Sequence, residues 1–303
     1  MPKTGARKTN LSIYIISGKP AAMLRRFLVI LSGMRSAKEL SLDNKLIKKI
    51  GEFKLSGKAE AVLKLLLSDK ELQTVQEYAN TVSIVRLGFN DHGPVHMRIV
   101  VMNAMLMLNL LRRAKIKTSL EQDGCGDFED SLTAVICAAM MHDVGMVISR
   151  QDHDLHSVTV AYPILDRILA KVFGTDMGKR VMIRSMALEG IVGHMGTRTV
   201  HSLEAGVVQI ADGCDMTKGR ARIPIAMHQT KGGYIHQYSA NSIEKVNLCK
   251  GKEKPILIDV LMSDDVGLFQ VEEVLLRKIS NSTAKPYIEL QARVGDRPVK
   301  QYL

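Results

Sequence analysis

Aromatic residues and paired cysteines are scarce in this chain. Only 4% of its 303 residues are aromatic and none is tryptophan, which leaves few side chains on which nucleic-acid bases could stack. We also find no zinc-finger or helix-turn-helix signature, so nucleic acid is a disfavoured partner. The four cysteines form no Cys-x-x-Cys pair, which argues against a disulfide framework and a thiolate zinc site. A reducing cytoplasm is therefore the expected location.

The N-terminal region lacks an apolar run long enough for a bilayer. The stretch 27–31 is short, and Arg25 and Arg26 precede it, so it does not approach the ~20 residues that a membrane helix needs. No small-residue cleavage pattern closes the stretch, as a secretion signal would require. We therefore expect neither membrane association nor secretion. Met23 and Met34 remain alternative starts of the chain.

Positive charge is plentiful but unevenly distributed. The formal net charge is +11, and residues 1–64 hold fourteen Lys and Arg against four Asp and Glu, so the rest of the chain is almost neutral. A solvated basic extension with a first helix is the simpler interpretation, and a role at a phosphate backbone or a membrane surface is the alternative. We expect this segment, residues 1–33 in particular, to be peripheral to the chemistry.

Helical periodicity dominates the chain between residues 65 and 230. The apolar content of 46% is ample for a core. Residues 94–113 are apolar on nearly all sides, with Pro94 suited to a first turn, and predict a central buried helix. Further helices are predicted at 131–147, at 155–173 with Pro163 kinking or splitting it, at 176–192 and at 202–216.

The pattern changes after residue 230 to that of a small α+β domain. The run at 253–262 is rich in β-branched residues, and the run at 287–294 alternates apolar and polar residues, as expected for strands. The predicted protein is thus mainly α, with a helical core followed by a domain at 231–303 that carries no cluster of catalytic groups and serves association, as a homodimer, or regulation. The predicted β-β-α-β order consists of strands at 243–249, 253–262 and 287–294, with a helix at 267–279 before the last strand.

Ligand-type residues concentrate where the helix at 131–147 approaches its end. His142 and Asp143 lie there, and His96 and Asp212 each lie inside an otherwise apolar helix, where an unpartnered imidazole or carboxylate would be costly. The economical explanation is that the four side chains converge from three helices on one cation. Imidazole and carboxylate together suit Mn²⁺, Fe²⁺ or Zn²⁺ or, with more water, Mg²⁺.

The order of these four residues resembles that of the HD superfamily of metal-dependent phosphohydrolases. HMRIV begins at His96, HDVG contains His142 and Asp143, and IADGCD contains Asp212. The resemblance implies a helical HD core in which these four residues bind a divalent metal.

The resemblance covers about residues 75 to 225. Within it, NDHGPVH (90–96) and DMTKGRARIP (215–224) look like an archaeal, largely uncharacterised branch of the superfamily that also carries a small C-terminal α+β domain. Extra histidines in such proteins can hold a second metal or contact the phosphate. His153 and His194 are the preferred candidates here and His156 is a third, whereas His92 and His201 are interpreted as polar loop or cap residues.

One departure from the family concerns the phosphate contact. Many relatives carry a lysine just after His-Asp-x-Gly, where this chain has Met146, and the nearest cation downstream is Arg150. Lys218, Arg220 and Arg222 follow the helix of Asp212 and are candidates to hold phosphate oxygens. A basic cap that answers the helix dipole is the alternative.

The function predicted from the sequence is hydrolysis of a phosphoester. A bound metal would activate water, Asp143 would orient that water or accept its proton, and Lys218 and Arg220 would offset charge on the phosphoryl oxygens. The substrate is expected to be a phosphorylated small molecule, namely a nucleotide, a cyclic dinucleotide or a small phosphomonoester. Two other classes stay open: a non-catalytic metal- and nucleotide-binding sensor that signals through its C-terminal domain, and a nucleic-acid-binding protein that uses the basic N-terminus.

Overall fold

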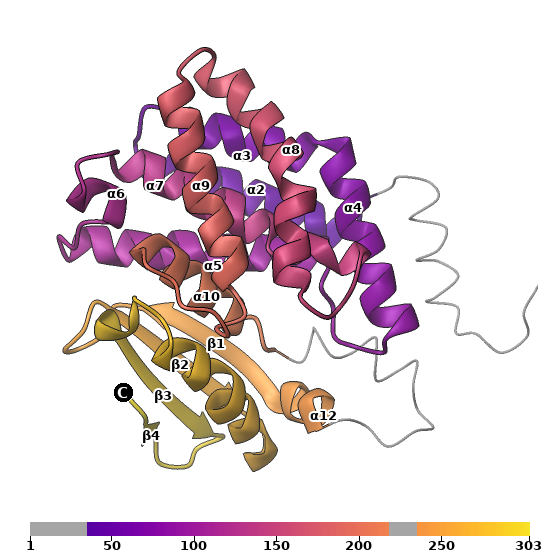
Figure 1. Cartoon of the computed structure of the whole chain (residues 1–303). Coiled ribbons are helices and arrows are strands. Elements are labelled where there is room, and N and C mark those ends of the chain that lie inside the picture. Colours follow the sequence, from indigo (N-terminus) through magenta and orange to yellow (C-terminus); the bar gives the residue numbers. More distant parts are fainter. Residues whose placement is uncertain (1–34, 218–234) are drawn as a thin grey trace, which may run out of the picture. The chain divides into compact units, whose positions relative to one another are not determined.

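The computed structural model describes residues 35–217 and 235–303. The basic extension at 1–33 lies outside these ranges, as do Lys218, Arg220 and Arg222, so what the sequence predicts for them stays a prediction. A single compact unit runs from Arg35 to Leu303. It contains a helical part and a C-terminal part with a small sheet, which are shown in Figure 1.

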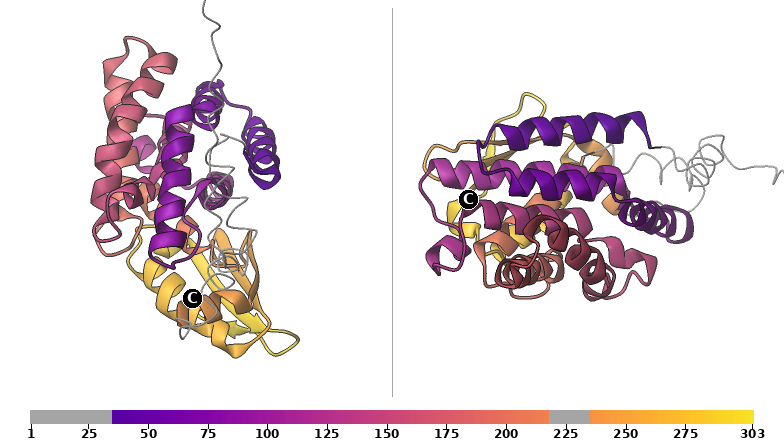
Figure 2. Two further views of the ribbon diagram at one scale, coloured as in Figure 1. Left: turned by 90° about the vertical axis from the view of Figure 1, so that its right-hand side faces the viewer. Right: turned by 90° about the horizontal axis from the view of Figure 1, so that it is seen from above.

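Buried helices form the centre of the helical part. Within the described ranges, α7 (Phe128–Met141) and α10 (Leu203–Gly213) are buried at every residue, and α5 (Pro94–Arg113) packs against both. In the right-hand view of Figure 2, α2 and the pair α8 and α9 lie on opposite sides of the helical part. The surrounding elements are α2 (Ala37–Gly51), α3 (Lys58–Ser68), α4 (Lys70–Thr81), the π-helical turn η1 (Val82–Arg86), α6 (Ser119–Gln122), α8 (His153–Phe173) and α9 (Met177–Gly193).

Residues 35–64 fold into this helical part, although their charge resembles that of the extension. Leu46 of α2 and Val62 of α3 are fully buried in the core. The carboxylate of Glu129 on α7 accepts hydrogen bonds from the backbone N–H groups of Gly57 and Ala59, and thereby satisfies donors that the start of α3 would otherwise leave open. The compact unit begins at Arg35, so the first helix that the sequence predicts within the basic segment 1–64 is part of it.

Helix ends differ from the prediction at two places. The helix expected over 131–147 ends at Met141, and a 3₁₀ turn, η2 (Val144–Val147), follows it. The helix expected over 202–216 ends at Gly213. Of the two alternatives for Pro163, a kink or a split, the structure excludes the split, because α8 continues through Pro163 as one element. Proline removes a backbone N–H from the helix ladder, but Pro163 and Thr159, whose carbonyl would have accepted it, are both exposed. Water can therefore satisfy that carbonyl, and the helix need not be split.

The C-terminal part is a mixed sheet in the order β1-β2-β3-β4. β1 pairs antiparallel with β2, β2 parallel with β3, and β3 antiparallel with β4. The parallel pair requires a crossover, which the helical elements between β2 and β3 provide. This confirms the predicted β-β-α-β order and adds a short last strand. The elements are α12 (Ile235–Ser242), β1 (Ile243–Cys249), β2 (Ile256–Met262), η3 (Asp265–Gly267), the π-helical η4 (Gln270–Leu275), α13 (Leu276–Ser280), η5 (Lys285–Tyr287), β3 (Ile288–Val294) and β4 (Lys300–Gln301).

Two helical segments in the described ranges are long and apolar enough to cross a membrane. They are Pro94–Arg113 and Phe128–Val147, and 61% and 94% of their apolar windows are buried inside the protein. Burial of this kind is what the core helices of a soluble protein show. Their apolar character is therefore accounted for by packing, because a helix that is hydrophobic all round can be a core helix as well as a membrane span.

Candidate metal centre

Six side chains from five segments of the helical part converge on one buried position. All six are 6% exposed or less, and subsets of them lie close enough together to hold a metal ion. We refer to these six residues as the histidine–aspartate cluster. They are His96 of α5, His142 and Asp143 of the turn after α7, His153 at the start of α8, His194 directly after α9 and Asp212 of α10.

The cluster has two halves. The Nε2 atoms of His96 and His142 are 3.1 Å apart, and those of His153 and His194 are also 3.1 Å apart. Asp143 lies between the halves. Its Oδ2 is 3.4 Å from Nε2 of His96 and 3.3 Å from that of His142, whereas its Oδ1 is 3.1 Å and 3.4 Å from Nε2 of His153 and His194. A single carboxylate therefore bridges the two halves.

Asp212 belongs to the first half. Its Oδ1 lies 3.1 Å from Nε2 of His96 and 3.7 Å from Nε2 of His142. The four residues that the sequence singles out as ligands thus lie together. His153 and His194, the preferred extra histidines, form the second half.

Backbone carbonyls fix the orientation of two imidazoles. Nδ1 of His142 lies 2.9 Å from the carbonyl oxygen of Ala139, and Nδ1 of His194 lies 2.6 Å from that of Ile191. A carbonyl only accepts, so Nδ1 carries the proton and donates in both cases. In a neutral ring, Nε2 then faces the cluster with its lone pair, as a metal-binding histidine requires.

His96 is oriented by a carboxylate that the sequence analysis did not single out. Its Nδ1 lies 2.7 Å from Oδ2 of Asp215, which is itself buried. The motif IADGCD contains two aspartates three residues apart, a spacing that places both on one side of a helix end. Asp212 thus contacts the Nε2 of His96 while Asp215 contacts its Nδ1. The second aspartate of the motif was the available signal.

A buried oxygen in the cluster lacks a suitable partner. Among the described residues, Oδ2 of Asp143 makes no hydrogen bond, although a buried carboxylate oxygen without a donor is costly. It faces the Nε2 of His142, whose proton lies on Nδ1. Two lone pairs at this distance repel each other unless a cation lies between them. The donor set of nitrogen and oxygen atoms therefore fits a divalent metal.

Burial and neighbouring charges set the ionisation of the cluster. Burial alone would raise the pKa of Asp143, but in the metal-free protein the positive charge of the protonated forms of His142 and His92 outweighs burial and holds that pKa well below its usual range. Burial would likewise raise the pKa of Asp212, yet the ammonium of Lys278 and a hydrogen bond from His96 hold it well below the usual range. The carboxylates are therefore anionic, which is the form that binds metal.

His194 is held in its neutral form. Burial lowers its pKa to about 4, against the opposing effect of Asp143. In the metal-free protein, the unfolded chain therefore binds a proton between pH ~6.5 and ~4 that the folded protein does not. We expect the free energy of unfolding to fall by about 2 kcal/mol between pH 7 and pH 5 from this residue. Urea unfolding in the presence of a chelator measures it, and a smaller pH dependence is expected for His194→Gln. An equal dependence in both proteins would contradict the assignment.

The remaining candidates from the sequence lie at the edge of the cluster or outside the described residues. Nη1 of Arg150 is 2.9 Å from Nδ1 of His153, and its guanidinium lies over the ring of Phe89 at 5.6 Å. The ring centroid of His92 is 6.0 Å from that of His96, so this loop histidine is a neighbour of the cluster. His156 is half-buried in the first turn of α8, and none of the metal-binding groups within the described ranges includes it.

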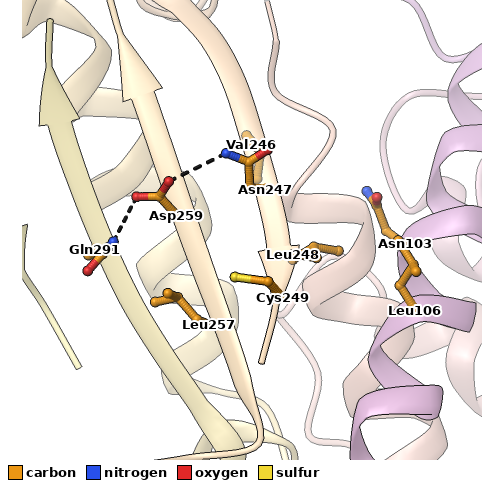
Figure 3. Close-up of a pocket in the computed structure, with 9 residues that line it drawn as sticks. All are labelled: Asn103, Leu106, Val246, Asn247, Leu248, Cys249, Leu257, Asp259 and Gln291. Carbon is orange, nitrogen blue, oxygen red and sulfur yellow. Dashed lines mark hydrogen bonds between the residues drawn. The ribbon is translucent and has the colours of Figure 1, made fainter. Parts of the chain in front are cut away.

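In the described part of the chain, the cavity that reaches the cluster is small. A cavity of about 30 Å³ touches His96 and Asp215, a volume near that of one water molecule. A groove of about 540 Å³ lies between α5 and the strands β1, β2 and β3 (Figure 3). Asn247 and Gln291 donate to Asp259 along its floor. No residue that lines this groove belongs to the histidine–aspartate cluster, so the groove is not part of the candidate metal centre.

The fold and the cluster define a mainly helical protein with a buried nitrogen–oxygen site suited to a metal. The uncharacterised protein MJ1020 of Methanocaldococcus jannaschii is 40% identical to the chain over 246 residues, which are 81% of this chain and 93% of that protein. The chain therefore belongs to the same family as MJ1020.

A second, weaker similarity is to a protein of known name. A region of 153 residues is 24% identical to Ribonuclease Y of Clostridium tetani, and it covers 48% of this chain and 26% of that protein. No family model matches the chain. No solved structure matches it significantly.

Proposed function

We propose that the protein is a metal-dependent phosphohydrolase of the HD type. The observation that carries the proposal is the position of Asp143, whose two oxygens each face a different pair of imidazole nitrogens. Such a bridge suits two divalent cations, one in each half of the cluster. His96, His142, Asp143 and Asp212 would hold the first cation, and Asp143, His153 and His194 would hold the second.

Each part of the cluster has a role in the proposed reaction. A bound divalent cation supplies Lewis acidity, which lowers the pKa of water and polarises a phosphoryl group. Asp143 is anionic and orients the attacking water or accepts its proton. Arg150 lies beside the second half and would offset charge on the phosphoryl oxygens. We propose the same role for Lys218, Arg220 and Arg222.

The site and the comparisons together support a substrate class. Nitrogen and oxygen ligands bind hard or borderline divalent cations, and such cations polarise phosphoryl groups for attack by water. The proposed substrate is therefore a nucleotide, a cyclic dinucleotide or a small phosphomonoester. Similarity to a protein named as a ribonuclease favours a phosphodiester among these. We propose that the protein acts in the cytoplasm as a homodimer.

Metal analysis and a hydrolysis screen test the proposal. The purified protein is expected to contain up to two equivalents of Mn, Fe, Zn or Mg. It should hydrolyse a model phosphodiester, such as bis-p-nitrophenyl phosphate, faster than p-nitrophenyl phosphate, and nucleotides and cyclic dinucleotides are screened beside them. Chelation should abolish activity and the added metal should restore it. A protein that binds no divalent metal under any loading condition would refute the proposal.

A non-catalytic sensor is the second candidate. The observation that favours it is the ion pair between Asp212 of the cluster and Lys278 of the C-terminal part, which links the site to a domain that could signal. A nucleotide that binds in the presence of metal and is recovered unchanged would support this function over hydrolysis.

A further inference from the structure

A lysine of the C-terminal part reaches the cluster. Lys278 lies on α13, and its side chain is only 10% exposed. Its Nζ donates a hydrogen bond to Oδ2 of Asp212 and another, of 2.8 Å, to the backbone carbonyl of His194. Both acceptors belong to residues of the cluster, one in each half. The ammonium group therefore lies next to the cluster, although Lys278 follows Asp212 by 66 residues in the sequence.

Hydrogen bonds hold this lysine in place. The side-chain amide of Gln209 on α10 donates to the backbone carbonyl of Lys278 at 2.9 Å. The residues just after α13 add three more contacts to the helical part. Asn281 donates to the carbonyl of Gly196 at 3.0 Å, Ser282 to that of Gly206 at 2.9 Å, and Thr283 to that of Ser202 at 2.6 Å.

Glycines on α10 allow this close approach. A Cβ on Gly206 would overlap the hydroxyl of Thr283, and a Cβ on Gly213 would lie 3.2 Å from Cδ of Lys278. The two glycines are seven residues apart and so lie on the same side of α10. Gly213 therefore leaves room for the lysine stem of α13, and Gly206 leaves room for the residues that follow α13.

The ammonium group selects between the two oxygens of Asp212. Its hydrogen bond occupies Oδ2, while Oδ1 lies 3.1 Å from Nε2 of His96. The carboxylate therefore presents Oδ1, rather than the hydrogen-bonded Oδ2, to the imidazoles of the cluster. Three buried aspartates, Asp143, Asp212 and Asp215, lie around His96. The ammonium group of Lys278 compensates part of their negative charge.

We propose that Lys278 is a positioning residue of the metal centre, through which the C-terminal domain fixes Asp212 as a one-oxygen ligand. This rests on the proposed metal site and goes beyond it. The domain is then part of the active site, in contrast to the sequence-based expectation that it carries only association or regulation. Partners that orient a metal ligand typically contribute 10- to 100-fold to metal affinity.

The test uses the full-length protein and Co²⁺ alone. In Lys278→Met the stem is retained and the charge is lost, so Asp212 can turn or offer both oxygens. We expect 10- to 100-fold weaker Co²⁺ binding by calorimetry and a changed visible absorption spectrum of the bound Co²⁺. Lys278→Arg retains a donor for Oδ2 and should recover most of the affinity and the spectrum.

Arg277→Gln is the matched control, because it removes a positive charge from the adjacent residue of α13, whose side chain is 70% exposed. It should leave both measurements unchanged. If Lys278→Met does not fold, as judged by circular dichroism, Lys278→Gln replaces it in the comparison with Lys278→Arg. Unchanged or tighter Co²⁺ binding in the folded Met or Gln variant, with an unaltered spectrum, would overturn the inference while leaving the proposed function intact. Absence of Co²⁺ binding by the unmodified protein would instead contradict the proposed function.

Discussion

Asp143→Asn is expected to remove metal from both halves of the cluster and to lower hydrolysis more than 100-fold. The substitution keeps the size of the side chain but removes the charge that faces four imidazole nitrogens. Loss of a ligand should exceed the 10- to 100-fold effect typical of the groups that merely orient ligands. Metal content per chain and initial rates with a model phosphodiester measure the two effects.

Two further variants sharpen this experiment. Asp154→Asn is the matched control, because Asp154 is a buried aspartate on α8 that pairs with Arg198 rather than with the cluster, and it should retain its metal. His153→Gln should lose only the cation of the second half. Normal metal content in Asp143→Asn, with a folded chain, would rule out the bridging assignment.

Gly145→Ala is expected to destabilise the protein by about 1–3 kcal/mol, the usual range for overpacking, and to displace His153. A Cβ at this position would overlap the backbone carbonyl of His153 and the backbone nitrogen of Ser157, and would lie 2.8 Å from the carbonyl carbon of His156. Backbone atoms of α8 cannot move aside as a flexible side chain could. The free energy of unfolding in urea and the metal content should therefore fall together.

Ser157 further constrains the backbone around Gly145. Its hydroxyl accepts a hydrogen bond from the N–H of Gly145 and donates one to the carbonyl of His142, so the turn after α7 is held against α8 on both sides. Gly178→Ala is the control, because a Cβ there meets only one atom, at an ordinary distance of 3.6 Å. Equal unfolding midpoints for Gly145→Ala and the unmodified protein would show that this turn can shift without cost.

Local sequence patterns predict the helices well where packing agrees with them. The helix at 94–113 has the predicted bounds because its apolar surface and Pro94 at its first position indicate the same element. The end of α7 was missed because it depends on a distant contact. The chain turns after Met141, and this turn brings Gly145 into contact with α8. The hydrophobic periodicity within residues 131–147 cannot predict a contact with a helix outside that range.

The candidate site shows the same division between local and distant signals. His96, His142 and Asp212 could be proposed from the sequence because burying a polar side chain inside an apolar helix requires a partner. Lys278 could not be proposed in this way. It lies on a short helix of ordinary composition, and its relevance arises only from the packing of α13 and of the residues after it on two glycines of α10.

The assembly of the cluster from distant segments links metal binding to folding of the helical part. His96 and Asp212 approach within 3.1 Å only when α5 and α10 are packed together, and the second half further requires α8 and the end of α9. An unfolded chain cannot present these atoms together, so a cation bound here would stabilise the native state by mass action, by about 2.7 kcal/mol when its concentration is 100 times its dissociation constant. The same ion would then serve as a cofactor and as a cross-link between helices, and metal starvation would increase the fraction of unfolded chains as well as that of inactive ones.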